Sequence, residues 1–293
     1  MSPEGRAAEL RAQWSLGPLT PVAETPSSRI WRCDSPHGPA ALKLLKPAGL
    51  EELQGATALH HWQGRAAARL LAHAPDAMLL EWLDGPTLGD RVRTASDGDT
   101  FPRLADFIRH LHAPSLLPKN PRGEAPQASG GRQPPSTPST LPALGDLPDH
   151  FAPLLGSTDP GLAPARAARA LLARPRPPVV LHGDLHHDNI IETPSGWRVI
   201  DPKGLWGDPG FEHANLFRNP VGRPGLALDP ARIRALAKAL TPEEPARPLA
   251  WALALTGLSR AWGGSAEGLA FNAALAEALG RALADVPNGA EWA

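Results

Sequence analysis

The sequence of 293 residues contains no tyrosine, a single cysteine and only 2 methionines. Since Cys33 has no second cysteine to pair with, the fold cannot depend on an internal disulfide, which suits a reducing, cytoplasmic setting. No run of about eighteen apolar residues is present, which argues against a transmembrane helix. The N-terminal segment has no basic stretch followed by an apolar run, so we expect no signal peptide.

An excess of charge of either sign is also absent. Lysine and arginine number 29 against 30 aspartates and glutamates, so the net charge is −1. We therefore expect neither nucleic acid nor an anionic membrane as a partner. The apolar share of 42% and the charged share of 20% are those of a globular protein, and the length suits about two domains. The oligomeric state stays open.

The first part of the chain predicts a small antiparallel sheet. Residues 18–25, 29–34 and 40–45 form short, partly alternating apolar segments, and proline, serine and glycine lie between them. Apolar residues at helical spacing predict a helix over residues 51–63. Residues 69–72 and 78–83 read as further strands. We expect a sheet-rich first domain to end near residue 83.

The remainder, residues 84–293, reads as helical. Its segment 118–142 is dominated by Pro, Gly, Ser and Thr, which predicts a flexible surface insertion; a proline-rich partner motif is the alternative. Helices are expected at residues 149–155 and 164–173. Three stripes of apolar residues then predict buried helix faces, namely Ile233, Leu236 and Leu240; Trp251, Leu255, Leu258 and Trp262; and Leu269, Ala273, Ala276 and Leu283. Sheet and helices together indicate an α+β protein.

The most informative segment is a polar cluster, HisGlyAspLeuHisHisAspAsn, between two apolar segments at residues 179–191. Asp184 and Asn189 have the spacing of the base and the metal-binding Asn in the kinase pattern H-R-D-L-x-x-x-N. Asp201 follows the next short strand, where kinases carry their second metal ligand. Because Mg²⁺ prefers oxygen ligands, Asn189 and Asp201 are candidate Mg²⁺ ligands and Asp184 is the candidate base.

A lysine completes this set. Ala41-Leu42-Lys43 matches the end of the kinase strand Val-Ala-Ile-Lys, whose lysine orients ATP. Two other interpretations of the polar cluster stay open. His182, His186 and His187 with Asp184 and Asp188 have the side chains of a zinc or di-iron site, and the cluster is also compatible with a polar loop that does no catalysis.

HGDLHHDNI followed by VIDPKGLWGDPGFEHANLFRNP resembles the aminoglycoside and hydroxyurea antibiotic-resistance kinase family, and within it the streptomycin 6-kinases most. EELQGATALHHWQGRAAARLL, MLLEWLDGPTLGD and LTGLSRAW extend the similarity over most of the chain. The resemblance implies a two-lobe, protein-kinase-like fold, with a small antiparallel-sheet N-lobe and a larger helical C-lobe. It also implies ATP and Mg²⁺ as cofactors and a small-molecule hydroxyl as acceptor.

The resemblance implies a role for each matching residue. Asp184 becomes the base, Asn189 and Asp201 the metal ligands, and Lys43 the contact to the α/β-phosphates. Glu81 to Leu83 becomes the hinge that binds adenine. The loop over the phosphates contains Ser27 and Ser28 in place of glycines, and Glu52 is the candidate ion-pair partner of Lys43, since Thr57 stands where relatives have an acidic residue. Residues expected to support the catalytic loop are His182, Asp188 and Asp208.

The acceptor implied by the resemblance is an aminoglycoside such as streptomycin. Streptomycin carries two guanidinium groups, which carboxylates bind well. Candidate carboxylates are Glu212, Asp146, Asp149 and Glu267. A hydroxyurea-type or metabolite alcohol is the alternative acceptor, and a pseudokinase with a regulatory role is the alternative outside catalysis.

Overall fold

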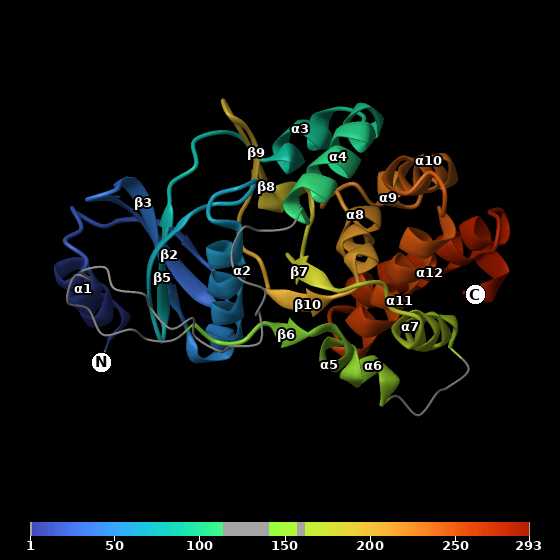
Figure 1. Ribbon diagram of the computed structural model, residues 1–293, viewed down its shortest axis with the longest axis horizontal. Helices are drawn as coiled ribbons and strands as arrows, with labels where there is room; N and C mark the ends of the chain where they lie inside the picture. Colours follow the sequence, from blue (N-terminus) through green and yellow to red (C-terminus); the bar gives the residue numbers. More distant parts are fainter. Residues whose placement is uncertain (1, 114–140, 157–161, 293) are drawn as a thin grey trace.

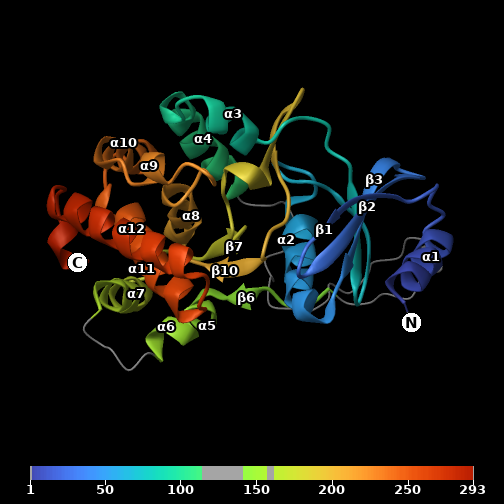
Figure 2. The same cartoon turned by 180° about the vertical axis from the view of Figure 1, so that it is seen from behind.

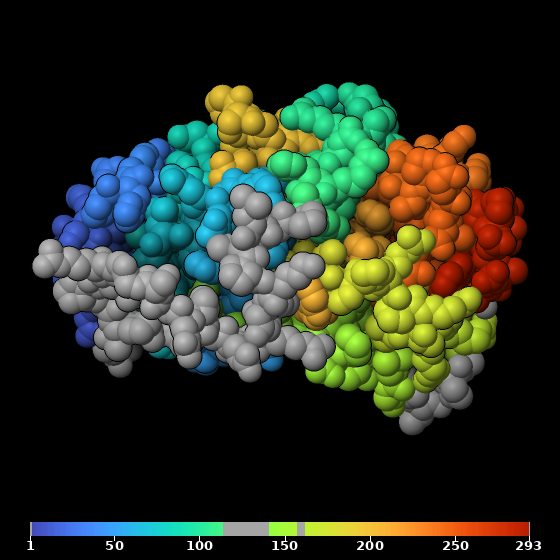
Figure 3. Space-filling model, viewed as in Figure 1, coloured from blue at the N-terminus to red at the C-terminus, as the bar shows by residue number. Residues whose placement is uncertain are grey.

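A computed structural model describes residues 2–113, 141–156 and 162–292. The N-terminal strands and the helices of the rest of the chain form two lobes (Figure 1). In a space-filling view the N-terminal residues and the C-terminal helices lie at opposite ends of the molecule (Figure 3). The insertion expected at residues 118–142 lies almost wholly outside the described residues, and the division near residue 83 stays a prediction.

The small lobe is an antiparallel sheet of five strands in the order β1-β2-β3-β5-β4. Its elements in chain order are α1 (Pro3–Gln13), β1 (Thr20–Glu24), β2 (Ser28–Ser35), β3 (Gly38–Leu45), the 3₁₀ helix η1 (Pro47–Leu53), α2 (Gln54–Trp62), β4 (Leu70–Ala74) and β5 (Ala77–Glu81). All five expected strands are therefore confirmed. The expected helix over residues 51–63 is divided between η1 and α2.

Side-chain alternation along β3 decides which residues face the larger lobe. Leu42 and Leu44 pack with Leu10 of α1 on one face of the sheet, while Leu45 packs with Ala56 of α2 on the other. Successive side chains of a strand point to opposite faces, so Lys43 shares the face of Leu45. In Figure 1, α1 and α2 lie on opposite sides of the sheet, with α2 next to the helical lobe.

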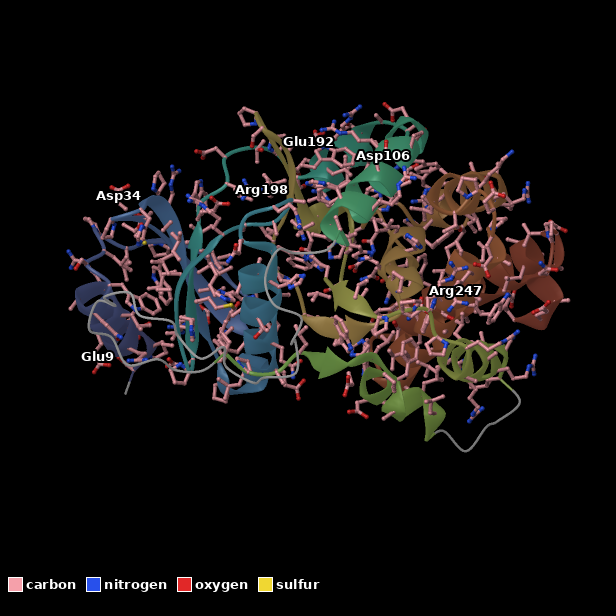
Figure 4. The ribbon with its side chains drawn as sticks, in the orientation of Figure 1. Glu9, Asp34, Asp106, Glu192, Arg198 and Arg247 are labelled. Atoms are coloured by element: carbon pink, nitrogen blue, oxygen red, sulfur yellow. The ribbon has the colours of Figure 1, made fainter. Side chains whose placement is uncertain are left out.

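Two small β structures connect the lobes. β8 (Ile190–Thr193) and β9 (Gly196–Val199) form a hairpin, and β10 (Leu205–Gly207) lies between β6 (Gly145–Asp146) and β7 (Val179–Leu181). Arg198 of β9 donates from Nε to the carbonyl oxygen of Ala67 at 3.0 Å and forms an ion pair with Glu81 of β5. Figure 4 shows Arg198 between the sheet of the small lobe and the helical lobe.

The larger lobe is built on α11 (Ala246–Ala261), whose residues 246–259 are all buried. An apolar helix with no solvated face belongs at the centre of a bundle, and α7 and α12 lie beside it (Figure 2). The other helices are α3 (Leu88–Thr94), α4 (Phe101–Leu111), α5 (Leu147–His150), α6 (Ala152–Leu155), α7 (Ala163–Ala173), α8 (Ala214–Phe217), α9 (Pro224–Ala227), α10 (Pro230–Leu240) and α12 (Ala266–Ala284), with 3₁₀ turns η2 (Gly98–Thr100), η3 (His187–Asn189), η4 (Pro209–His213) and η5 (Gly289–Glu291).

The helical stripes are confirmed for α10 and only in part elsewhere. On α11, Trp262 was expected inside but is 50% exposed just after the helix ends. On α12 the expected stripe is wrong: of its members only Leu283 is buried, and the buried face runs through Asn272 and Leu275 instead. Among the described residues, no helix is long and apolar enough to cross a membrane.

Candidate active site

The loop that carries Asp184 begins where β7 ends and is paired with the segment that carries Asp201. The backbone N–H of Lys203 donates to the carbonyl oxygen of His182 at 2.8 Å, and that of Ile200 donates to Asn189 at 3.0 Å. His182 also places Nε2 2.8 Å from the carbonyl oxygen of Ile200. These bonds bring the candidate base and the candidate metal ligands to one place.

Asp184 is oriented by its neighbours. Its backbone N–H donates to Nδ1 of His182 at 3.2 Å, and the side-chain amide of Asn189 donates to its carbonyl oxygen at 3.0 Å. The amide of Asn215, at the start of α8, donates to its carboxylate Oδ1. Among the described residues, Oδ2 has no partner, so one carboxylate oxygen is left to receive a proton.

Glu212 of η4 supports this loop from inside the protein. It is 1% exposed and accepts hydrogen bonds from the backbone N–H groups of His182 at 2.7 Å and Gly183 at 3.0 Å. Burial opposes its ionisation, but the hydrogen bond and charge of His112, 3.1 Å away, together with the charge and backbone N–H of His182, outweigh burial and lower the pKa of Glu212. The expectation that Glu212 lines the acceptor site is therefore wrong, because its carboxylate is fully occupied beneath the loop.

The candidate ATP-orienting lysine joins both lobes. Lys43 is 4% exposed, and its Nζ lies 2.6 Å from Oε2 of Glu52 in η1 and forms a second ion pair with Asp201. Burial opposes the charged ammonium, but the charges of Asp201 and then Glu52 raise the pKa of Lys43 above its usual value. The pairing expected between Lys43 and Glu52 is present. Thr57 instead donates to the carbonyl oxygen of Pro142 at 2.6 Å.

The candidate metal ligands suit a hard cation. Asp201 has a φ of 61°, a left-handed conformation that is strained for a residue with a side chain and recurs at functional sites. Its side chain is 54% exposed. Because the amide nitrogen of Asn189 is used on Asp184, its oxygen is left to face an ion. One carboxylate, one amide oxygen, waters and phosphates form a usual Mg²⁺ environment.

The rival metal site is not assembled. Within the described ranges, no three His, Cys, Asp or Glu side chains are grouped to hold a metal ion. Both ring nitrogens of His182 have protein partners, and His187 is fully buried. Asp188 instead pairs with Arg93 of α3 at 2.7 Å, and Asp208 accepts from the backbone of Gly210 at 2.8 Å, as supporting residues would.

The two expected phosphate-loop serines are placed differently. Ser28 is 1% exposed, and its hydroxyl lies 3.1 Å from Oγ1 of Thr25, so it closes the turn between β1 and β2. Ser27 is half-buried in the same turn and lies nearer the surface. At the expected hinge, the N–H groups of Glu81 and Trp82 donate to Arg69 and Pro39. Leu83 N–H has no backbone partner in the described part of the chain.

The surface beside Asp184 has residues that the sequence reasoning missed. His150 of α5 lies 5.1 Å from Trp262, ring centroid to centroid, and Nζ of Lys203 lies 5.8 Å from the same ring. Burial, then the charge of Lys203, lowers the pKa of His150 to about 4, whereas Asp184 acts in the opposite direction. Burial lowers the pKa of Arg218, and the charge of Asp184 acts in the opposite direction. Arg218 donates a hydrogen bond to the hydroxyl of Ser259 at 2.6 Å. These side chains have no spacing that marks them in the sequence.

Comparisons with known proteins agree with the kinase interpretation of this site. The model of the family described as aminoglycoside/hydroxyurea antibiotic resistance kinase matches residues 13–266. A streptomycin 3''-kinase of Klebsiella pneumoniae is 39% identical over 85% of this chain and 89% of its own length. A streptomycin 6-kinase of Streptomyces griseus is 34% identical over 59% of this chain and 52% of its own. The expected family is confirmed, while the 3''-kinase matches more of the chain than the expected 6-kinase subgroup.

The fold is similar to that of an aminoglycoside phosphotransferase of known structure. A structure of the aminoglycoside phosphotransferase APH(4)-Ia, in a ternary complex with AMP-PNP and hygromycin B, superimposes with a TM-score of 0.62 at 17% identity. The match covers 95% of this chain and 99% of that one. The expected two-lobe, protein-kinase-like fold is thereby confirmed.

Proposed function

This chain belongs to the aminoglycoside/hydroxyurea antibiotic resistance kinase family, and from this premise we propose that it transfers the γ-phosphoryl group of ATP to a hydroxyl of streptomycin. As a member of the family it is a small-molecule kinase. The observation that carries the mechanism is the grouping of Asp184, Asn189, Asp201 and Lys43 at one site, from both lobes. A pseudokinase would not need this complete set.

In this proposal Asp184 accepts the proton of the acceptor hydroxyl through the carboxylate oxygen that Asn215 leaves unoccupied. Lys43 orients the α/β-phosphates, with Glu52 holding its ammonium in place. Ser27 and Ser28 would form the turn over the phosphates, where Ser27 is the less buried of the two, and the N–H of Leu83 and the carbonyl of Glu81 would bind adenine. We also propose a cytoplasmic location for the protein, because ATP is available there.

Asn189 and Asp201 would hold Mg²⁺. The ion, when bound, supplies positive charge next to the phosphates. Asp201 pairs with Lys43 through Oδ1, so its second carboxylate oxygen would be available to the ion.

Streptomycin is proposed as acceptor because streptomycin kinases match the chain, the 3''-kinase over the larger share. The test is phosphate transfer from ATP to streptomycin by purified protein, with the product's phosphorylated position assigned by NMR and with growth of a streptomycin-sensitive host as a second readout. The 3''-hydroxyl is the first position to examine. Asp184→Asn is the inactive control. A protein that binds ATP but neither transfers nor protects would exclude streptomycin.

A neutral acceptor of the hydroxyurea type is favoured by one observation. Of the carboxylates proposed for guanidinium binding, Glu212 is buried, and the polar side chains found beside Asp184 include two cations, Lys203 and Arg218. These charges repel a cationic acceptor. Hydroxyurea in the same transfer assay separates the two acceptors, because this second proposal requires its turnover to exceed that of streptomycin.

A further inference from the structure

The catalytic loop must supply more than a base. During phosphoryl transfer, negative charge is spread over the three outer oxygens of the transferring group, and hydrogen-bond donors aimed at them lower the barrier. Kinase sites commonly use a lysine or arginine for this, but the loop from His182 to Asn189 contains neither. Its side-chain N–H donors are three histidines and one asparagine.

Three of these four donors are already committed or inaccessible. Both ring nitrogens of His182 bond within the protein, to Ile200 and Asp184. The amide of Asn189 donates to the carbonyl oxygen of Asp184. His187 is 0% exposed beneath the loop, 3.8 Å from the buried Asp97. This leaves His186 as the loop side chain with a donor to offer.

The tautomer of His186 is set by its own loop. Nδ1 accepts the backbone N–H of Asp188 at 3.3 Å, which caps η3, so the ring proton of the neutral imidazole lies on Nε2. Nε2 has no hydrogen-bond partner in the described part of the protein, and the side chain is 19% exposed.

The position of His186 is also suitable. It is two residues from Asp184 and has an extended backbone. Asp184 and His186 are partly exposed while Leu185 and His187 are buried, so the first two side chains lie on the same side of the loop. A donor on the side of the base can reach the phosphoryl group that passes to the acceptor hydroxyl.

We propose that His186 is a further catalytic residue, whose Nε2–H donates a hydrogen bond to an outer oxygen of the transferring phosphoryl group. This inference rests on the proposed kinase function. In the step, the acceptor oxygen forms a bond to the γ-phosphorus, the bond from that phosphorus to the ADP oxygen breaks, and the hydroxyl proton passes to Asp184. His186 keeps its own proton throughout.

Two substitutions distinguish the role of Nδ1 of His186 from the role of Nε2. In His186→Asn the side-chain oxygen takes the place of Nδ1 and still caps the turn, since asparagine is a good N-cap, but no donor remains at the position of Nε2. In His186→Gln the amide nitrogen is as many bonds from the backbone as Nε2, so a donor remains while the cap is lost. A purely structural role predicts that Asn is the better replacement, and a catalytic role predicts Gln.

The measurement is kcat and KM for ATP in phosphate transfer, with melting temperature alongside. We expect His186→Asn to lower kcat about 10²-fold with KM for ATP and melting temperature near wild type, and His186→Gln to keep kcat within about tenfold. Wild-type kcat in His186→Asn, or equal losses in both variants, would overturn the proposal. If wild-type protein phosphorylates no acceptor tested, the acceptor assignment fails, and the same pair is compared in ATP hydrolysis, where water is the acceptor.

Discussion

At the scale of single residues, Asp184 has one carboxylate oxygen bound by Asn215 and one without a described partner. Asp184→Asn preserves the shape but cannot accept a proton, so we expect kcat to fall by about 10² to 10⁴ while ATP affinity is kept. Transfer assays and calorimetric ATP titration measure the two effects. Asp34→Asn, at an exposed position, is the matched control. More than a tenth of wild-type activity in Asp184→Asn would show that another group is the base.

The side chains of Asp201 and Asn189 differ in charge, so their substitutions can be told apart. Asp201→Ala removes a formal charge and Asn189→Ala only a dipole, so both should shift the Mg²⁺ dependence of activity to higher concentration, and Asp201→Ala should shift it further. Activity against Mg²⁺ concentration for the three proteins measures this. Superimposable Mg²⁺ curves would remove both residues from the metal site.

Residue spacing was enough to predict that Asp184, Asn189 and Asp201 lie close together, because few residues separate them along the chain, and the match to the kinase strand pattern singled out Lys43, which pairs with Asp201. Their roles as base, metal ligands and ATP contact stay predictions. Residue spacing was not enough for Glu212. As a carboxylate in a polar stretch it was interpreted as a surface group that binds the acceptor, yet it is 1% exposed. Its partners are backbone N–H groups, which every residue has, so no pattern of side chains reveals them.

At the scale of elements, two glycines allow the start of α2 to touch the segment after Asp201. A Cβ on Gly55 would overlap the carbonyl oxygen of Pro202, and one on Gly204 would overlap that of Gln54. We expect Gly55→Ala to lower the free energy of unfolding by about 1 to 3 kcal/mol, since backbone has to move. Urea unfolding measures the change.

The matched control is Gly280→Ala in α12, where a Cβ meets nothing within 4 Å. It should stabilise the protein by up to about 1 kcal/mol, because alanine is the better helix former. A Gly55→Ala protein as stable as wild type would mean that this contact between the lobes is loose.

The strands were easier to predict than the helix faces. β3 is a short run of apolar residues around one lysine that begins at a turn, and such a run predicts a buried strand. In α12, by contrast, small apolar residues occur on every side, so several faces have similar hydrophobicity and only packing against α10 and α11 selects the buried one. Trp262 lies beyond the end of α11, where helical periodicity no longer applies.

At the scale of the whole molecule, buried histidines make stability depend on pH. Burial, then the charge of Arg232, lowers the pKa of His187 to about 3. The unfolded chain therefore binds this proton below about pH 6.5 while the folded protein does not, so stability is full above pH 6.5 and falls as the pH falls toward 3. At pH 5 the loss from one such histidine is about 2 kcal/mol.

His187→Gln should remove this share of the pH dependence. We expect the difference in unfolding free energy between pH 7 and pH 5 to shrink by about 2 kcal/mol relative to wild type, whatever the variant's absolute stability. His37→Gln, at an exposed turn, should leave the difference unchanged. Equal pH slopes for His187→Gln and wild type would show that His187 titrates normally in the folded protein.

The bonds that hold Asp184 and the aromatic pair near it come from different parts of the chain. Glu212 and the ring of His182 hold the loop, whereas the charge of Asp184 acts on His150 of α5, whose ring lies against Trp262 at the end of α11. Substitutions at His150 and Trp262 change this aromatic pair and break none of the bonds that hold the base. Under selection by a new drug, these two positions can therefore vary while the residues that hold the catalytic loop stay under purifying selection.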